Sequence, residues 1–280
     1  WENPLHLWQS LRDAPNLSIA CRKLSEEGKK IHEERVEWNQ KQGYVSFGMG
    51  PVGDRDPWGI TIGPFNPPSL NEWRVDGLAL RGSSDRRGDF AVALEGNRVI
   101  DMILPSGLHT HGISKKLNGA VRSPILTNAK KRISFQVMGG KHAAVRLVSN
   151  NCQLNYRNFK ALKSDQWHWL TFDIPAGAAE LRCYVELMTK FDNPKFPDQL
   201  GTLGGDVDNQ RVPWEKAAAD PHSYFGVHRI VLHDGADPPK EHLPWAHYWL
   251  NDEAPKNLDE LSHCFAKVLC KVASNSAPGA

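Results

Sequence analysis

The strongest constraint on the fold is a run of alternating apolar and polar residues between Lys116 and Leu187. Four segments in this stretch carry apolar side chains at every second position, which is the period of a β-strand with one buried face. Their apolar sets are Ile133, Phe135 and Val137; Ala143, Val145 and Leu147; Leu170, Phe172 and Ile174; and Leu181, Cys183, Val185 and Leu187. Turn sequences, and no helical pattern, separate the segments, so we predict an antiparallel sandwich rather than a parallel sheet.

Further short strands are predicted on both sides of this stretch. The sequences WRVDGLAL, DFAVAL and RVIDMIL follow residue 72, and Gly96-Asn97 between the last two is typical of a tight hairpin turn. A late strand is expected from Tyr224 to Leu232, and residues 43–72 form loops because they are rich in Gly, Pro and Asn.

Two long helices are predicted near the ends of the sequence. From Ser18 to Gln42, apolar residues recur every seven positions among charged residues, which indicates a packing or spacer helix or, alternatively, a coiled-coil arm. Residues 257–272 form an amphipathic helix that begins with a capping box of Asn257 and Glu260. Its apolar face must pack on the sandwich, on the N-terminal helices or on a domain outside this chain.

Charge, hydropathy and cysteine spacing exclude several classes of protein. The net charge of +2 provides no strong field for a nucleic acid or an anionic membrane. The sequence contains no apolar run of about 18 residues, so no transmembrane segment is predicted. The five cysteines show no C-x-x-C spacing, which excludes a haem-attachment motif or zinc ribbon in this chain. Cys152 and Cys183 both lie among the strands, but their spacing does not show whether they form a disulfide.

Several motifs resemble one family. They are the run LPSGLHTHGISKKLNGAVRSPILT from Leu104 to Thr127, the segment Val145–Leu154, WHWLTFDI from Trp167 to Ile174, the LRCYVEL strand, and YFGVHRIVLHDG from Tyr224 to Gly235. In these motifs the chain resembles the central module of large secreted planctomycetal proteins that also carry a planctomycete cytochrome-c-type domain, a cytochrome-associated domain and a C-terminal domain of unknown function. The resemblance covers about the middle half of the chain.

The resemblance implies a fold, a location and a division into domains. The fold would be a mainly β, antiparallel jelly-roll sandwich of the galactose-binding-like type, with a helical N-terminal segment and a C-terminal amphipathic helix. We expect a helical segment at 1–42, the sandwich at 43–239 with an insertion at 189–223, and a linker with the amphipathic helix at 240–280, leading to a following domain. The protein would be secreted, periplasmic or on the cell surface, with neighbouring domains of the same protein as partners.

One polar corner of the predicted sandwich has the chemistry of a sugar site. An aromatic platform beside planar polar groups suits a sugar, because the ring packs on its C–H face and the polar groups bond its hydroxyls. Trp167 and Trp169 share the side opposite Leu170, where they are either covered or exposed for stacking. The candidate carbohydrate-binding residues are Tyr156, Asn155, Arg157, Arg122, His111 and Asn151, and the alternative is an ordinary polar hairpin.

Two patterns suggest metal ligands. Asp206 and Asp208 place oxygen ligands at alternate positions and are candidates for calcium, although the rest of an EF-hand is missing and a solvated loop is the alternative. His109 and His111 would suit a transition metal with a third ligand from elsewhere, but in the resembling family the first position is often aromatic. We expect no other cofactor within this chain.

The best candidate for acid–base catalysis is the pair Asp173 and Glu186, on the faces opposite the apolar sets of their strands. A solvated or ion-paired sheet face is the simpler interpretation. The prediction is therefore a non-catalytic carbohydrate-binding module of a larger exported, cytochrome-containing protein, with a polysaccharide or other glycan as its partner. The alternatives are a structural spacer that positions a haem domain and a C-terminal domain, and a glycoside hydrolase.

Overall fold

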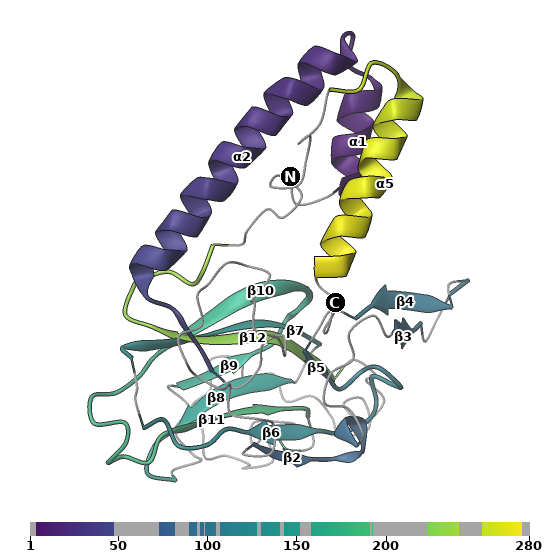
Figure 1. Ribbon diagram of the computed structural model, residues 1–280. Helices are drawn as coiled ribbons and strands as arrows, with labels where there is room; N and C mark the ends of the chain where they lie inside the picture. The colour runs from purple at the N-terminus through teal and green to yellow at the C-terminus, as the bar shows by residue number, and fades with distance from the viewer. Residues whose placement is uncertain are drawn as a thin grey trace. The chain divides into compact units, whose positions relative to one another are not determined.

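The computed structural model describes residues 4–47, 73–81, 90–93, 96–97, 99–104, 107–127, 130–140, 143–151, 158–190, 192, 223–240 and 254–275. The chain divides into two compact units. A helical unit comprises residues 1–44, 51–63 and 239–280, and a β-sandwich unit comprises residues 45–50 and 64–238 (Figure 1). The segments 1–42 and 240–280, which the sequence predicts as separate parts, therefore belong to one unit.

The sandwich consists of two antiparallel sheets of five strands each. Sheet A has the order β1 (Val45–Ser46), β12 (Phe225–His233), β7 (Arg132–Gly139) and β10 (Ser164–Asp173), and β5 (Leu108–His109) also pairs with β12. Sheet B has the order β2 (Arg74–Asp76), β6 (Ala120–Arg122), β11 (Tyr184–Met188), β8 (Ala144–Val148) and β9 (Phe159–Ala161). A short 3₁₀ helix, η2 (Leu78–Leu80), follows β2, and β3 (Phe90–Val92) and β4 (Ile100–Ile103) form the predicted hairpin.

The four alternating segments are divided between the two sheets. Strands β7 and β10 pair in sheet A, and β8 and β11 pair in sheet B. All four predicted apolar sets contribute to one core between the sheets, in which Phe135 and Phe172 meet edge to face with ring centroids 5.8 Å apart. Burial of one face of each strand is therefore confirmed.

Successive strands cross repeatedly from one sheet to the other. The chain passes from β5 in sheet A to β6 in sheet B, back to β7, then to β8, and later from β10 to β11 to β12. This alternation joins distant segments of the chain into each sheet, as in jelly rolls. The predicted mainly β, antiparallel, jelly-roll-like sandwich is confirmed.

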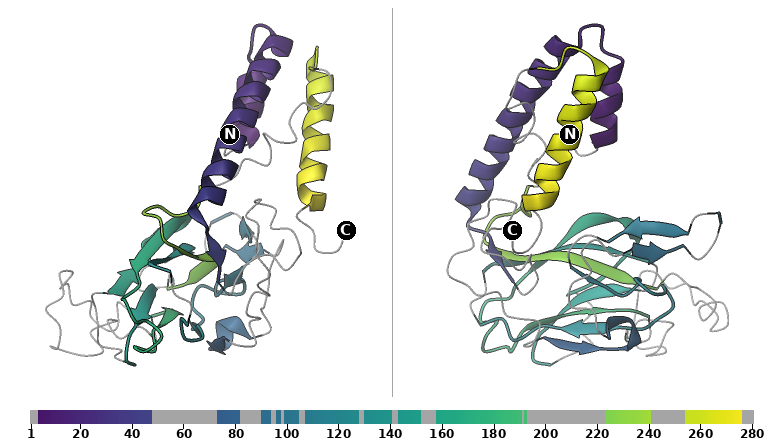
Figure 2. Two further views of the ribbon diagram at one scale, coloured as in Figure 1. Left: turned by 60° about the vertical axis from the view of Figure 1, so that its left-hand side comes forward. Right: turned by 45° about the vertical axis from the view of Figure 1, so that its right-hand side comes forward.

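The helical unit contains α1 (Pro4–Arg12), α2 (Leu17–Gln42) and α5 (Leu258–Asn275). Asn16 caps α2 by accepting a hydrogen bond from the Ile19 amide at 3.1 Å. The first bond of the predicted capping box of α5 is present, because the Glu260 amide donates to Asn257 Oδ1 at 2.9 Å, while the Glu260 carboxylate accepts from the Lys256 amide at 2.8 Å. The Ser18 hydroxyl bonds the Pro255 carbonyl at 2.8 Å, so α2 and α5 begin at the same end of this unit (Figure 2).

The apolar face of α5 packs on the N-terminal helices. Leu261, Phe265 and Val268 share a small core with Leu11 of α1 and Cys21 of α2. The rings of Trp8 and Phe265 meet edge to face with centroids 5.5 Å apart. Of the three surfaces considered for this face, the structure therefore selects the N-terminal helices. None of the described helices is both long and apolar enough to cross a membrane.

Candidate functional site

Three charged side chains form a row across the outer face of sheet B. On neighbouring strands, Arg146 of β8 lies opposite Glu186 of β11, and Glu186 lies opposite Arg122 of β6. The flanking residues of each strand belong to the apolar core. Because side chains alternate between the faces of a strand, the three charged groups point out of the sandwich.

Glu186 accepts hydrogen bonds from both arginines, one at each carboxylate oxygen. Arg122 donates through Nε to Oε1, and Arg146 donates through Nε to Oε2. The side chains of Glu186 and Arg146 are almost fully buried, whereas that of Arg122 is 41% exposed. Arg122 is thus the accessible end of the row, and its guanidinium is held in one orientation by a buried carboxylate.

The charge of Arg122 is reinforced by its neighbours. Burial lowers the pKa of the Arg122 guanidinium, but the hydrogen bond and the charge of Glu186 raise it by more, so that this pKa lies above its ordinary value. The charges of Tyr184 and Asp192 also raise the pKa of Arg122, so both groups lie within electrostatic range of it. The site therefore presents a charged, planar donor with a phenol and a carboxyl group in its surroundings.

Tyr184 lies on the same outer face, two residues before Glu186 on β11. Its side chain is half-buried, and its hydroxyl donates to Asn151 Oδ1 at 3.4 Å. Asn150 and Asn151 have φ values of 52° and 55°, in the left-handed region that asparagine tolerates better than most residues. This turn places the exposed amide of Asn151 next to the Tyr184 ring.

Two carboxyl groups complete the other side of the Arg122 site. Burial raises the pKa of Asp192, and the nearby charge of Asp76 raises it further, while Arg122 lowers it. Asp76 ends β2, and its Oδ1 accepts a hydrogen bond from the Gly77 amide at 2.7 Å. The Asp192 carboxyl group therefore lies within electrostatic range of Arg122, and Asp76 lies within range of Asp192.

A pocket of about 390 Å³ adjoins this face, with Asp76 in its wall. It is lined by Val75, Asp76, Gly77, Leu78, Leu80, Arg81 and Asn118. Val75 and Leu78 are exposed by 41% and 52%, so apolar surface lies beside polar groups here. The wall is tight at Gly77, whose φ is 97° and whose position could not carry a Cβ, because that atom would lie 2.4 Å from the Asn118 carbonyl oxygen.

The structure brings together only part of the predicted sugar site. Arg122 and Asn151 both lie at the outer face of sheet B, joined through Glu186 and Tyr184. Three predicted ligands of the sugar (Tyr156, Asn155 and Arg157) and the predicted calcium ligands (Asp206 and Asp208) lie outside the described residues.

His111 belongs to a different cluster. Its ring is 1% exposed and lies with its centroid 5.5 Å from that of His109 and 4.5 Å from that of Tyr224. Tyr224 in turn donates to Asp165 Oδ1 at 2.6 Å. These residues lie beside sheet A, where Thr110 bonds the Phe225 backbone, so His111 belongs to this buried cluster and its assignment to the sugar site stays a prediction.

No metal centre is found in the part of the chain that the structure describes. Among those residues, no group of three or more His, Cys, Asp or Glu side chains is arranged to hold an ion. His109 and His111 are close to each other but lie among aromatic rings, including that of Trp167 at 5.7 Å. The described cysteines form no disulfide, and the buried Cys183 lies 3.1 Å from the Ser149 hydroxyl.

The centre of the outer face of sheet A is buried, and Trp167 and Trp169 on this face are both half-buried. Gln136 and Arg229, at outward positions of β7 and β12, are only 7% and 6% exposed. The outer face of sheet B is equally buried at Arg146 and Glu186, and Arg122 is its exposed end. The two tryptophan rings are therefore neither fully covered nor open.

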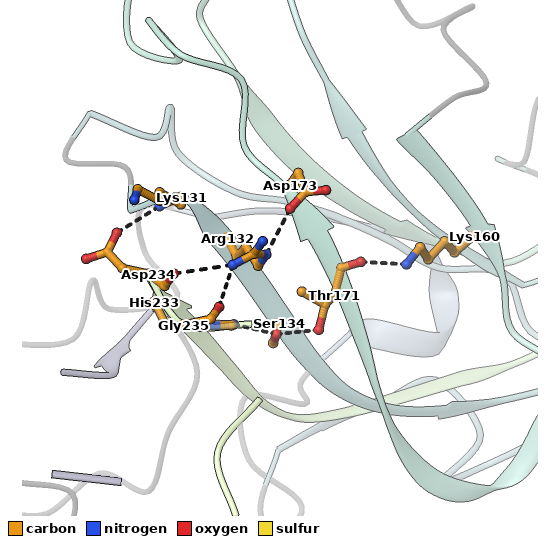
Figure 3. A network of polar contacts seen from close by, with 9 residues as sticks. All are labelled: Lys131, Arg132, Ser134, Lys160, Thr171, Asp173, His233, Asp234 and Gly235. Carbon is orange, nitrogen blue, oxygen red and sulfur yellow. Dashed lines mark hydrogen bonds and ion pairs between the residues drawn. The ribbon is translucent and has the colours of Figure 1, made fainter. Parts of the chain in front are cut away.

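The catalytic pair considered for glycoside hydrolysis is not formed. Asp173 ends β10 in sheet A and is bonded to Arg132 at 2.9 Å, with its side chain 85% exposed (Figure 3). Glu186 belongs to sheet B and is fully buried against two arginines. The two carboxylates point outward from opposite sides of the sandwich, so they cannot flank one glycosidic bond.

A second polar network lies at the Asp173 end of sheet A (Figure 3). The Ser134 hydroxyl is 2.7 Å from His233 Nε2 and 2.7 Å from Thr171 Oγ1, and His233 Nδ1 lies 3.0 Å from the Gly235 carbonyl oxygen. A carbonyl oxygen can only accept, so Nδ1 carries the proton and the neutral ring accepts at Nε2. Ser134 and His233 are both 0% exposed, which makes this a structural cross-strand link and not a nucleophile with its base.

The sequence did not predict Arg146, Tyr184 or Asp192 as site residues, nor the pairing of Glu186 with two arginines. A signal was present, because VRL at 145–147 and VEL at 185–187 each place one charge at the outward position between two inward apolar residues. Which outward charges meet, however, depends on the register of strands that are far apart in the sequence.

Comparison with known proteins identifies no family for this chain. No protein-family model matches, and no curated protein matches. Several solved structures of β domains align with it. One is the K1 cleaved adhesin domain of Lys-gingipain from Porphyromonas gingivalis W83, at 9% identity over 59% of this chain and 92% of that chain, with a TM-score of 0.28.

Two aligned structures are xylan-binding domains. The xylan-binding module CBM15 aligns at 10% identity over 60% of this chain and 94% of that chain, with a TM-score of 0.24. The CBM22-2 domain of Paenibacillus barcinonensis Xyn10C aligns at 14% identity over 59% of this chain and 92% of that chain, also with a TM-score of 0.24. Because these scores are low, the fold assignment depends on strand topology, and any functional assignment depends on the site itself.

Proposed function

We propose that the chain is a non-catalytic carbohydrate-binding module whose ligand lies on the outer face of sheet B, around Arg122. The observation that carries the proposal is the accessible guanidinium of Arg122, which Glu186 holds in place, with Tyr184 on the same face two residues before Glu186. A planar donor fork can bond two neighbouring hydroxyl groups, and an aromatic ring can pack on the C–H face of a sugar.

The charge balance of the site favours a neutral ligand. Across this face, the arginines at 74, 122 and 146 are matched by the carboxyl groups of Asp76, Glu186 and Asp192. A phosphate backbone would require an excess of positive charge, which is absent among these residues. A neutral polysaccharide can use both the donors and the carboxyl acceptors, so this is the ligand class that we propose.

The pocket beside Asp76 extends the proposed site. Its volume of about 390 Å³ lies in the range of small-molecule pockets. Asp76, Arg81 and Asn118 offer polar groups, and Val75 and Leu78 offer apolar surface. A saccharide chain over Arg122 would place its next ring in or near this pocket.

The proposal is tested by titration calorimetry of the full chain against neutral xylans, glucans, mannans and galactans. Arg122→Lys keeps the charge but removes the planar fork, and we expect it to weaken binding of the recognised glycan about 10-fold or more. Arg132→Lys is the matched control, because Arg132 also pairs with a carboxylate, that of Asp173, but lies in sheet A. Failure of the unmodified chain to bind any glycan would refute the proposal, as would equal binding by Arg122→Lys.

We also propose, from the sequence motifs, that the module belongs to a larger exported protein of the planctomycetal family described above. One argument for the competing role, a spacer between a haem domain and a C-terminal domain, is not supported by the structure. That argument was an apolar face of the C-terminal helix left for another domain, whereas Leu261 and Val268 are buried within the helical unit.

A further inference from the structure

Two cysteines from opposite ends of the sequence lie in the helical unit, on helices that contribute to one small core. Cys21 is fully buried in the small core that α2 forms with α1 and α5. The residues of α5 in that core are Leu261, Phe265 and Val268. Cys21 therefore belongs to the core to which α5 contributes.

Cys264 lies on the face of α5 that packs in this core. It follows Leu261 by three residues and precedes Val268 by four, and such spacings share one face of an α-helix. Its side chain is half-buried, at the margin of the core. Both cysteines lie near the helix ends at which α2 and α5 begin, where Ser18 bonds the Pro255 carbonyl.

The electrostatics of the two thiols agree with this placement. Burial raises the pKa of the Cys21 thiol to about 11, and the charge of a Cys264 thiolate contributes to the increase. The two thiols therefore lie within electrostatic range of each other.

We propose that Cys21 and Cys264 form a disulfide that cross-links α2 to α5 in an oxidising environment. The bond would join the N-terminal and C-terminal helices and enclose the sandwich sequence in a covalent loop. The helical unit has few buried apolar residues, and small cores are often reinforced by disulfides. This inference is independent of the proposed glycan site.

The chemistry requires a disulfide oxidant, for which oxidised glutathione is the probe. The half-buried Cys264 loses its proton, and its thiolate attacks the glutathione disulfide, releasing one glutathione thiolate and leaving a mixed disulfide. Cys21 then loses its proton and attacks the Cys264 sulfur, which forms the protein disulfide and releases the second glutathione thiolate. The two protein thiols lose two protons and two electrons, and the glutathione disulfide gains the electrons.

The other described cysteines provide contrasts. Cys270 lies on the same helix but is exposed, so it should react with glutathione without forming this cross-link. Cys183 is buried in the sandwich beside Ser149. Because Cys21 has a high pKa, the second step should be slow at pH 7 and faster at pH 9.

The test is oxidation of the full chain with oxidised glutathione, followed by alkylation, proteolysis and mass spectrometry. We expect a peptide pair joined through Cys21 and Cys264, which dithiothreitol separates. Cross-linking should raise the midpoint of thermal unfolding of the helices by about 5 °C. Cys270→Ser should leave the cross-linked pair intact, and Cys264→Ser should abolish it.

Cys264→Ser is the preferred variant because its side chain is only half-buried, whereas Cys21→Ser places a hydroxyl in the core. A product in which Cys264 carries only glutathione while Cys21 remains reduced, at pH 9 as well as at pH 7, would overturn the proposal. A dominant link between Cys264 and any other cysteine would also overturn it.

Discussion

Arg146 and Glu186 face each other across strands β8 and β11, and their side chains are only 4% and 0% exposed. Burying such charges is unfavourable unless each is paired and hydrogen-bonded. Glu186 meets this requirement by accepting from Arg146 at one oxygen and from Arg122 at the other. The pair therefore supports the sheet and also fixes the direction in which Arg122 points.

Removing the carboxylate should destabilise the sandwich strongly. Glu186→Gln leaves Arg146 buried without a counter-charge, and we expect the free energy of unfolding to fall by about 3–5 kcal/mol in urea titrations. Glu180→Gln is the control, because Glu180 is exposed and its replacement should change stability by less than about 0.5 kcal/mol. Equal stabilities of the two variants would show that the buried charges are not coupled.

Replacing both buried partners should restore part of the loss. In Arg146→Met with Glu186→Met, no charge remains unpaired in the sheet, so we expect the double variant to be more stable than Glu186→Gln by at least about 1 kcal/mol. Its glycan binding should nevertheless be weak, because Arg122 would lose the acceptor that orients it. On one preparation, urea titration measures the free energy of unfolding and calorimetry measures glycan binding, so the two effects are separated.

The wall of the pocket should be sensitive to a single methyl group. Gly77→Ala introduces a Cβ 2.4 Å from the Asn118 carbonyl oxygen, and we expect a loss of about 2–4 kcal/mol together with weaker glycan binding. Gly96→Ala is a matched control, because Gly96 also has a positive φ of 83° but no atom lies within 4 Å of the added Cβ. It should lose only about 1 kcal/mol. Similar losses in both variants would mean that the Gly77 backbone conformation, and not the contact with Asn118, determines the effect.

Stability should fall on the acidic side of neutrality because of His233. Burial lowers the pKa of this histidine, Arg132 lowers it further, and the Gly235 carbonyl and the carboxylates of Asp234 and Asp237 raise it by less. The folded-state pKa therefore lies below the unfolded value of about 6.5. The unfolded state then binds more protons, so this contribution is complete above about pH 6.5 and is lost as the pH falls through the interval between the two pKa values.

The measurement is the midpoint of thermal unfolding from pH 8 to pH 5. Between pH 8 and pH 5, the unfolding midpoint of the unmodified chain should fall by more than that of His233→Gln. His168→Gln is the control, because His168 bonds the Gln166 carbonyl two residues away on its own strand, and this variant should retain the pH dependence of the unmodified chain. Parallel curves for all three proteins would contradict the assignment to His233.

The local periodicity determined which residues face the core. Alternation placed Phe135, Val145, Phe172 and Val185 inside, and each is buried between the sheets as predicted. The start of the C-terminal helix was also predicted from the sequence, since Asn257 and Glu260 bond each other within one turn. These features depend on neighbours a few residues away, and such neighbours are visible in a sequence.

The pairing of strands was decided by the tertiary structure. Asp173 and Glu186 both occupy outward positions of their own strands, yet β10 and β11 belong to different sheets and the two carboxylates are on opposite sides. Arg122, Arg146 and Glu186 meet because three distant strands align in one register. The sequence alone determined the faces, whereas the partners across each face required the fold, because every strand could pair with several others at a similar local cost.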